Sequence, residues 1–281
     1  MTRSPSLRAI RTVRALKEHL RRPPWVRPGH YYSPSTCPQD IERSLSWDHE
    51  APGVDLRQRA QLDLVQEMAP LLDQSPYDRY RPDNNMFGMA DAAVLRAMLR
   101  YLRPRHVVEV GSGFSTAMLL DTADDTNLAI DLTCVEPYPD RLLSLLKPDD
   151  RIRLIRKPVQ DVPLSTYDML GANDLLFVDS THVAKAGSDV LWLLLHVLPR
   201  LSPGVAVHIH DIFWPFEYPE TWLREGRDWN EAYLLHAFLC HNSAWELLLF
   251  SSWLWSTHPQ LLPTNLRDSR PGSLWMQRRI A

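Results

Sequence analysis

Apolar residues recur at helical spacing in the first part of the chain. Over residues 55–73 they lie three or four positions apart, which predicts a helix. A second helix is expected to start near Asp91, a candidate N-cap, and to end before Pro104. The prolines of residues 21–35 rule out a helix there, and we expect an ordered arm or a cover on the substrate side.

From residue 106 onward, short apolar runs rich in β-branched residues alternate with helical segments. Five runs are expected to be strands: residues 106–110, 132–137, 151–155, 174–179 and 205–211. Helical patterns lie between most of them, for example over residues 115–123 and 188–201. Apolar strands that alternate with helices indicate a parallel sheet covered on both faces.

The end of the chain follows another pattern. Residues 245–255 and 273–280 have strand-like sequences, and a proline-rich loop separates them. A connection without a helix usually joins antiparallel neighbours. We therefore expect an α/β fold, a doubly wound, seven-stranded and mostly parallel sheet with an antiparallel C-terminal strand. This Rossmann-like domain is expected over residues 91–281, after a helical and proline-rich extension over residues 1–90.

Within that extension, residues 7–20 have apolar side chains at helical spacing with arginine and lysine between them. The apolar positions are Leu7, Ile10, Val13, Leu16 and Leu20. Such a helix either lies on anionic lipid or packs against protein. We expect it to pack on its own domain or on a second subunit, and the extension is therefore a candidate homodimer contact.

Composition narrows the class of protein. A net charge of −3 argues against a dedicated nucleic-acid binder. The three cysteines are widely spaced and form no CxxC pair, which predicts a reducing compartment and no thiolate metal site. No run approaches ~18 apolar residues, so no transmembrane helix is expected, and the first residues lack the apolar core of a signal peptide. We expect a soluble, cytoplasmic protein.

The stretch VVEVGSGFST, residues 107–116, ends a predicted strand in a glycine turn. A dinucleotide-binding turn has a third glycine and binds pyrophosphate, but here Thr116 takes that position. Glu109 comes before the first glycine, where a carboxylate would repel a pyrophosphate and attract a cationic ligand. Glu136 ends the next strand, about twenty residues after the glycines, where an acidic side chain can accept hydrogen bonds from ribose hydroxyls.

The sequence EVGSG, with Glu136 after the next strand and a terminal hairpin, resembles the class I S-adenosylmethionine-dependent methyltransferases over about residues 90–281. The resemblance implies S-adenosylmethionine as cofactor. It places the cofactor-binding residues in the loop, at the ribose and near the adenine: Glu109, Gly111, Ser112, Gly113 and Ser115; Glu136; and Gln160 with Asp161. The alternatives are a nicotinamide-dependent oxidoreductase with an altered loop and a methyltransferase-like fold that serves as a non-catalytic binding subunit.

A second group of polar residues follows the fourth and fifth predicted strands. It consists of Asp179, His182, His210 and Asp211. The placement is similar to O-methyltransferases in which acidic residues at these positions hold magnesium, which implies Asp179, His210 and Asp211 as metal ligands. A histidine among them weakens the assignment of Mg²⁺ and leaves Mn²⁺, Fe²⁺ or no metal as options. A metal-free mechanism with His182 or His210 as the base, and a structural role for the group, stay open. Asp179, His182 and His210 are the candidate catalytic residues.

His208 lies on the same strand face as His210, and we expect it to be a hydrogen-bonded core residue. Aromatic residues follow the fifth predicted strand: Phe213, Trp214, Phe216, Tyr218, Trp222 and Trp229. They either line a pocket for the methyl acceptor or pack against the sheet. The expected activity is O-methylation of a small-molecule or glycan hydroxyl.

Overall fold

The computed structural model describes residues 25–47, 50–72 and 77–280, and the helical pattern at residues 7–20 lies outside these ranges. The chain divides into two compact units. The described part of the smaller unit comprises residues 25–47 and 220–228, and the larger unit holds the rest. The segment before residue 91 is thus divided, because residues from 50 onward share a unit with the sheet.

The described part of the smaller unit contains two helices, α2 (Pro38–Leu45) and α8 (Glu220–Arg224). Arg224 donates to Glu42 at 2.8 Å, and this exposed ion pair joins the two helices. A second link is the hydrogen bond from the Thr36 backbone N–H to Asp228, at 3.0 Å. Surface pairs of this kind stabilise a structure only weakly.

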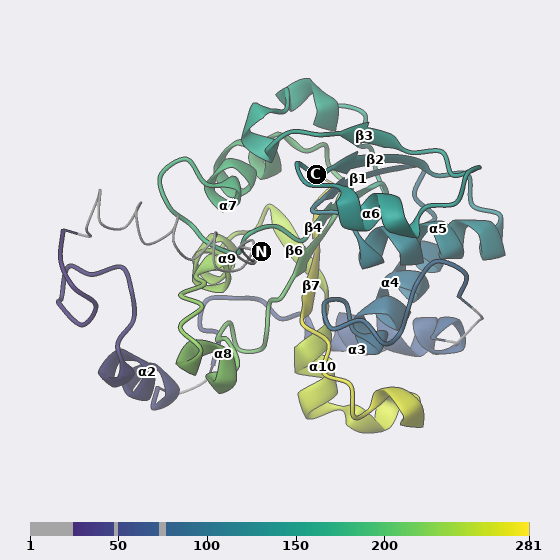
Figure 1. The fold of residues 1–281 in the computed structure, drawn as a ribbon. Helices are drawn as coiled ribbons and strands as arrows, with labels where there is room; N and C mark the ends of the chain where they lie inside the picture. The colour runs from purple at the N-terminus through teal and green to yellow at the C-terminus, as the bar shows by residue number, and fades with distance from the viewer. Residues whose placement is uncertain (1–24, 48–49, 73–76, 281) are drawn as a thin grey trace, which may run out of the picture. The chain divides into compact units, whose positions relative to one another are not determined.

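The larger unit is built on a seven-stranded sheet of order β3-β2-β1-β4-β5-β7-β6 (Figure 1). Neighbouring strands are parallel except at β7, which runs antiparallel to both β5 and β6. The strands are β1 (His106–Val110), β2 (Asp131–Val135), β3 (Arg153–Ile155), β4 (Leu175–Val178), β5 (Ala206–His210), β6 (Trp245–Phe250) and β7 (Ser273–Arg278). The predicted doubly wound sheet with an antiparallel last strand is confirmed.

Helices cover both faces of this sheet, with α3 to α6 on one side and α7 and α9 on the other (Figure 1). The α-helices of this unit are α3 (Gln58–Met68), α4 (Met89–Leu102), α5 (Phe114–Thr126), α6 (Asp140–Leu145), α7 (Asp189–Trp192), α9 (Glu231–Leu239) and α10 (Ser251–Thr257). The short 3₁₀ elements are η1 (Ala69–Leu71), η2 (Val159–Asp161), η3 (Leu164–Tyr167), η5 (Leu198–Arg200), η6 (Pro259–Leu261) and η7 (Thr264–Leu266), and one π-helical turn, η4 (Leu193–Val197), follows α7.

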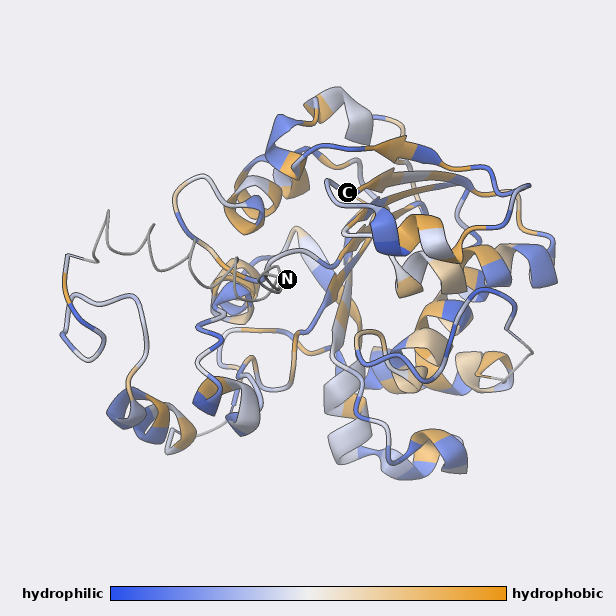
Figure 2. Cartoon of the chain, viewed as in Figure 1, coloured by the Kyte–Doolittle hydropathy of each residue, from blue (hydrophilic) through white to orange (hydrophobic). Residues whose placement is uncertain are grey.

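The core lies along the central strands. Every residue of β4 and β5 is buried. This explains why β4 is apolar at every position, whereas β5 also contains two buried histidines, His208 and His210. Figure 2 shows hydrophobic colour along the strands and hydrophilic colour on the outer sides of the helices. None of the described helices combines the length and the apolar character needed to cross a membrane.

Two details differ from the sequence prediction. The run at residues 245–255 is a strand only as far as Phe250, and α10 begins at the next residue. The hydroxyl of Ser251 donates to the Ser273 carbonyl at 2.7 Å and accepts from the Ser273 N–H at 3.0 Å, which anchors the start of the helix to β7. Asp91 is not an N-cap, because α4 starts at Met89 and the Asp91 carboxylate accepts from the Gly272 N–H at 3.1 Å.

Candidate active site

The site lies where the chain order of the strands reverses, at the carboxyl ends of β1 and β4. The Asp179 N–H donates to the Val110 carbonyl at 2.8 Å, so the loops after the two strands are in direct contact. Gly111 has φ 79°, and a Cβ atom there would lie 1.8 Å from the Asp179 carbonyl oxygen. Glycine is needed at this position because the second loop fills the space of a side chain.

Glu109 lies beneath the glycine turn and is fully buried. Its carboxylate accepts hydrogen bonds from the hydroxyls of Ser115, at 2.8 Å, and Thr116, both in the first turn of α5. The thiol of Cys134 is 3.6 Å away on β2. Glu109 therefore connects β1, β2 and the start of α5. A contact between Glu109 and the cofactor stays a prediction.

Glu136 lies at the edge of the same crevice, directly after β2. One carboxylate oxygen accepts from the Ser112 N–H at 3.2 Å and the other from the Tyr138 N–H at 2.7 Å. These two hydrogen bonds fix the orientation of the carboxylate. Each oxygen keeps a second lone pair that can accept from a ligand.

A cavity of about 370 Å³ opens between these loops, a volume within the usual range for small-molecule sites. Its lining consists of Met86, Phe87, Gly111, Ser112, Gly113, Phe114, Ser115, Glu136, Arg141, Asp179, Ser180, Thr181, His182, Asp211 and Trp229. The sequence did not point to Met86, Phe87 or Arg141. Gln160 and Asp161 are not among the lining residues, and the Gln160 amide donates to the Gly187 carbonyl at 2.9 Å. Their place near the adenine stays a prediction.

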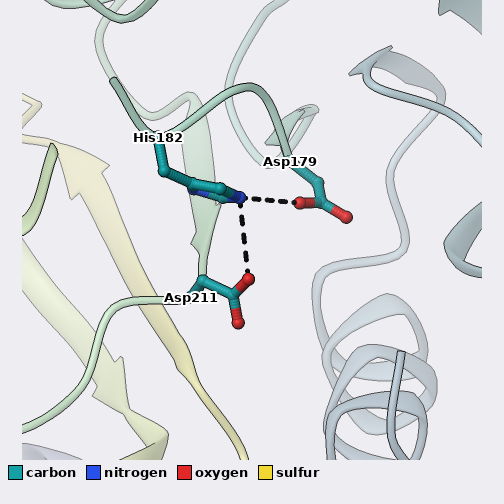
Figure 3. A group of neighbouring side chains, drawn as sticks. All are labelled: Asp179, His182 and Asp211. Carbon is teal, nitrogen blue, oxygen red and sulfur yellow. Dashed lines mark ion pairs between the residues drawn. The ribbon is translucent and has the colours of Figure 1, made fainter. Parts of the chain in front are cut away.

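Three side chains at one end of the cavity converge, as Figure 3 shows. Asp179 follows β4, His182 lies in the same loop, and Asp211 follows β5. The Nε2 atom of His182 is 3.4 Å from Asp179 Oδ1 and 3.6 Å from Asp211 Oδ2. One donor atom from each residue lies within 4.8 Å of the others, so the group could hold a metal ion. His182 and Asp211 have φ angles of 61° and 55°, an uncommon backbone conformation that is often found at functional sites.

His210 was expected among the metal ligands, and the donor atoms that converge are those of Asp179, His182 and Asp211. The His210 ring is buried and packs against Phe87 with ring centroids 5.1 Å apart. Its Nε2 atom comes no closer than 3.7 Å to Asp211 Oδ1. A role of His210 as a metal ligand stays a prediction.

His208 is a core residue, as predicted, but it is not hydrogen-bonded. Neither of its ring nitrogens has a partner among the described residues. The ring stacks on Phe177 with centroids 4.0 Å apart. Burial lowers the pKa of His208 well below its usual value, which keeps the ring neutral and suits stacking in the core.

The aromatic residues after β5 divide into two groups. Trp229 lines the cavity, and its ring centroid is 4.4 Å from that of His182. Trp214 and Phe216 pack around Phe250 at the end of β6, with centroids 5.8 and 5.1 Å from it. Packing against the sheet therefore accounts for part of the aromatic cluster, and one member faces the candidate site.

Burial and charge act in opposite directions on the ionisable groups of the site. Burial favours neutral His182, but the carboxylates of Asp179 and Glu231 outweigh it and raise the pKa of His182 to about 10. Burial also opposes ionisation of Asp179, yet the imidazoles of His210 and His182 hold its pKa below the usual value. The carboxylates around His182 therefore favour a cation at this position. A role of His182 as a general base stays a prediction.

Residues 108–212 match a family model described as a methyltransferase domain, Methyltransf_24. An uncharacterised protein of Archaeoglobus fulgidus is 31% identical over 163 residues, which cover 52% of this chain and 74% of that protein. The SAH-bound methyltransferase PaMTH1 of Podospora anserina is similar at 14% identity and a TM-score of 0.45, with both chains fully covered. The plantazolicin methyltransferase BpumL is similar at 13% identity and a TM-score of 0.47, over 79% of this chain and 98% of that one.

The chain belongs to the class I S-adenosylmethionine-dependent methyltransferases. S-adenosylmethionine is its cofactor, and the reaction is a methyl transfer. The matched segment runs from the third residue of β1 to the second residue after β5 and so contains the glycine turn, Glu136 and the Asp179 group. This membership favours a methyltransferase over the alternative of a nicotinamide-dependent oxidoreductase.

Proposed function

We propose that this methyltransferase acts on a hydroxyl oxygen of a small-molecule acceptor, and that a divalent metal ion held by Asp179, His182 and Asp211 binds that oxygen. The observation that carries the proposal is the convergence of these three side chains at one end of the cavity. The glycine turn and Glu136 lie along the same cavity. One cavity thus has room for a cofactor part and an acceptor part.

The proposed cofactor site is supported by polar atoms beside the cavity that can still form hydrogen bonds with a ligand. Glu136 is oriented by two backbone N–H groups and can accept from both ribose hydroxyls. Ser180 Oγ is buried beside the cavity and has no hydrogen-bond partner among the described residues. S-adenosylmethionine, when bound, supplies an electrophilic methyl group on a cationic sulfur. The proposed cofactor residues are Glu109, Gly111, Ser112, Gly113, Ser115 and Glu136, with Gln160 and Asp161 near the adenine.

The metal part is supported by the type and the spacing of the donor atoms. Two carboxylates and an imidazole suit Mn²⁺, Fe²⁺ and Zn²⁺, and the carboxylates suit Mg²⁺ as well. Donor atoms bound at ~2.1 Å to one ion lie about 3–4 Å apart, which agrees with the distances of 3.4 and 3.6 Å from His182 Nε2. A divalent ion would lower the pKa of the hydroxyl that it binds, so no protein base with a free lone pair would be required.

The acceptor part is flanked by apolar side chains. Met86, Phe87 and Trp229 line the cavity together with the Asp179 group. Flat apolar surfaces beside a polar anchor favour a ring-containing acceptor whose hydroxyl reaches the metal.

The test is turnover of the full chain with isotope-labelled S-adenosylmethionine and a panel of hydroxylated small molecules. We expect label on an oxygen, loss of turnover in chelator, and its return with a divalent ion. The variant Asp179→Asn should lose turnover while its affinity for SAH stays within a few-fold of wild type, because Asp179 would act on the acceptor side. The exposed Asp149→Asn is the matched control. Transfer to nitrogen, or full turnover in chelator, would contradict the proposal.

A further inference from the structure

His182 makes a second polar contact on the side away from Asp179 and Asp211. Its Nδ1 atom is 2.9 Å from Oε2 of Glu231, the first residue of α9. Glu231 is only 1% exposed, so its carboxylate is held inside the protein. Its partner is a residue 49 positions earlier in the sequence.

The backbone around Glu231 also forms hydrogen bonds with the His182 loop. The His182 carbonyl accepts from the N–H groups of Asn230, at 3.0 Å, and Glu231, at 3.2 Å. The Asn230 side chain accepts from the Ala184 N–H at 2.6 Å. Trp229 covers one face of the imidazole. Residues 229–231 therefore fix the position and the orientation of His182.

This arrangement sets which nitrogen of the neutral imidazole carries the proton. A carboxylate at Nδ1 accepts the Nδ1–H, and the lone pair then lies on Nε2. In the structure Nε2 faces the two carboxylates of the candidate metal group. A buried carboxylate behind a metal-bound histidine is a common device for orienting the ring and raising its basicity as a ligand.

We infer that Glu231 is a positioning residue that presents His182 Nε2 as a nitrogen ligand, and that the site therefore selects a divalent transition-metal ion such as Mn²⁺ over Mg²⁺. The inference rests on the metal assignment in the proposed function. It goes further because it names the residue that orients the ligand and the class of ion. Mg²⁺ prefers oxygen ligands, whereas imidazole is a good ligand for Mn²⁺, Fe²⁺ and Zn²⁺.

The first test needs no variant. Mn²⁺ binding to the full chain is measured by electron paramagnetic resonance, with Mg²⁺ as competitor. We expect Mn²⁺ to bind at least about tenfold more tightly than Mg²⁺. The ¹⁵N shifts of the His182 ring in the Zn²⁺-loaded chain should show a protonated Nδ1 and a metal-bound Nε2. Equal affinity for the two ions, or a proton on Nε2, would overturn the inference.

The second test uses Glu231→Gln, which keeps an oxygen at the same place but removes the charge. We expect Mn²⁺ affinity to fall by about 10- to 100-fold while SAH affinity stays unchanged. Glu67→Gln, on the exposed side of α3, is the matched control and should change neither affinity. Unchanged Mn²⁺ affinity in Glu231→Gln, with binding lost in Asp179→Asn, would overturn this inference and leave the proposed function standing. Turnover that persists in chelator would instead overturn the proposed function.

Discussion

At the level of single residues, Gly111 sets how closely the loops after β1 and β4 approach each other. Its φ angle of 79° is tolerated by glycine, and the Asp179 carbonyl occupies the space that a Cβ would need. The residue that begins the glycine turn thereby also places the backbone of Asp179. The cofactor part and the metal part of the site are thus linked through one backbone contact.

Glu109 gives a prediction for the pH dependence of stability. Burial raises the pKa of Glu109 from its ordinary 4.5 to about 7, so the folded chain holds a proton there that the unfolded chain has lost. Its contribution to the free energy of unfolding is full below about pH 4.5 and is lost as the pH rises through 7. The loss is on the order of 3 kcal/mol.

The variant Glu109→Gln should remove this dependence, because its amide does not titrate, while its one oxygen can still accept from Ser115 or Thr116. We expect urea unfolding of the cofactor-free variant to give a free energy that changes less than that of wild type between pH 5 and 8. Above pH 7 the variant should be the more stable of the two. Parallel pH profiles for the two proteins would show that Glu109 does not titrate in this range.

At the level of elements, the segment before α4 brings Met86 and Phe87 to the cavity. Arg79 is buried and forms ion pairs with Asp121, at 2.9 Å, with Asp124, at 2.8 Å, and with Asp150. The Tyr80 hydroxyl donates to the Phe87 carbonyl at 2.8 Å. The residue next to Arg79 is therefore hydrogen-bonded to the cavity wall.

Replacing Arg79 by leucine should therefore affect both stability and the cavity wall. Two buried carboxylates would lose their partner, which lowers the free energy of unfolding by about 3–5 kcal/mol. Hydrogen exchange at the amides of residues 84–88 should become faster, while SAH affinity should change little. The exposed neighbour Arg81→Leu is the control. Unchanged exchange in Arg79→Leu would mean that the wall is held by other contacts.

The same level shows how far sequence patterns reach. The bounds of β1, β4 and β5 were predicted within one residue, because short runs rich in β-branched and other apolar residues mark buried strands. The helix α10 was missed, since SSWLWST continues the apolar run of β6 without a break. What separates them is the pairing of Ser251 with Ser273, a contact across 22 residues that no local pattern contains.

The candidate site, like the fold, was predictable where it follows from the strands and unpredictable where it depends on contacts between distant segments. Residues that follow strands, such as Glu136, Asp179 and Asp211, could be located because the carboxyl ends of parallel strands meet at one edge of the sheet. The convergence of His182 with Asp179 and Asp211 could not be predicted, because it depends on loop conformation. Glu231 carries no signal of its own in the sequence, and only the packing of α9 brings it to His182.

At the level of the whole molecule, every residue that lines the candidate site belongs to the larger unit. The described part of the smaller unit contributes none of them. Within that unit, the links between α2 and α8 are an exposed ion pair and exposed hydrogen bonds, which stabilise weakly. The larger unit should therefore bind its ligands without residues 1–47. For these residues we propose another purpose, contact between two copies of the chain.

Removal of residues 1–47 tests both parts of this argument. We expect the shortened chain to bind SAH and Mn²⁺ within about twofold of the full chain in titration calorimetry, since the glycine turn, Glu136 and the His182 group all remain. Sedimentation should show a dimer for the full chain and a monomer for the shortened one. A monomeric full chain would contradict the role in dimerisation. A large loss of SAH affinity would show that the extension contributes to the site, so the two readouts separate the two claims.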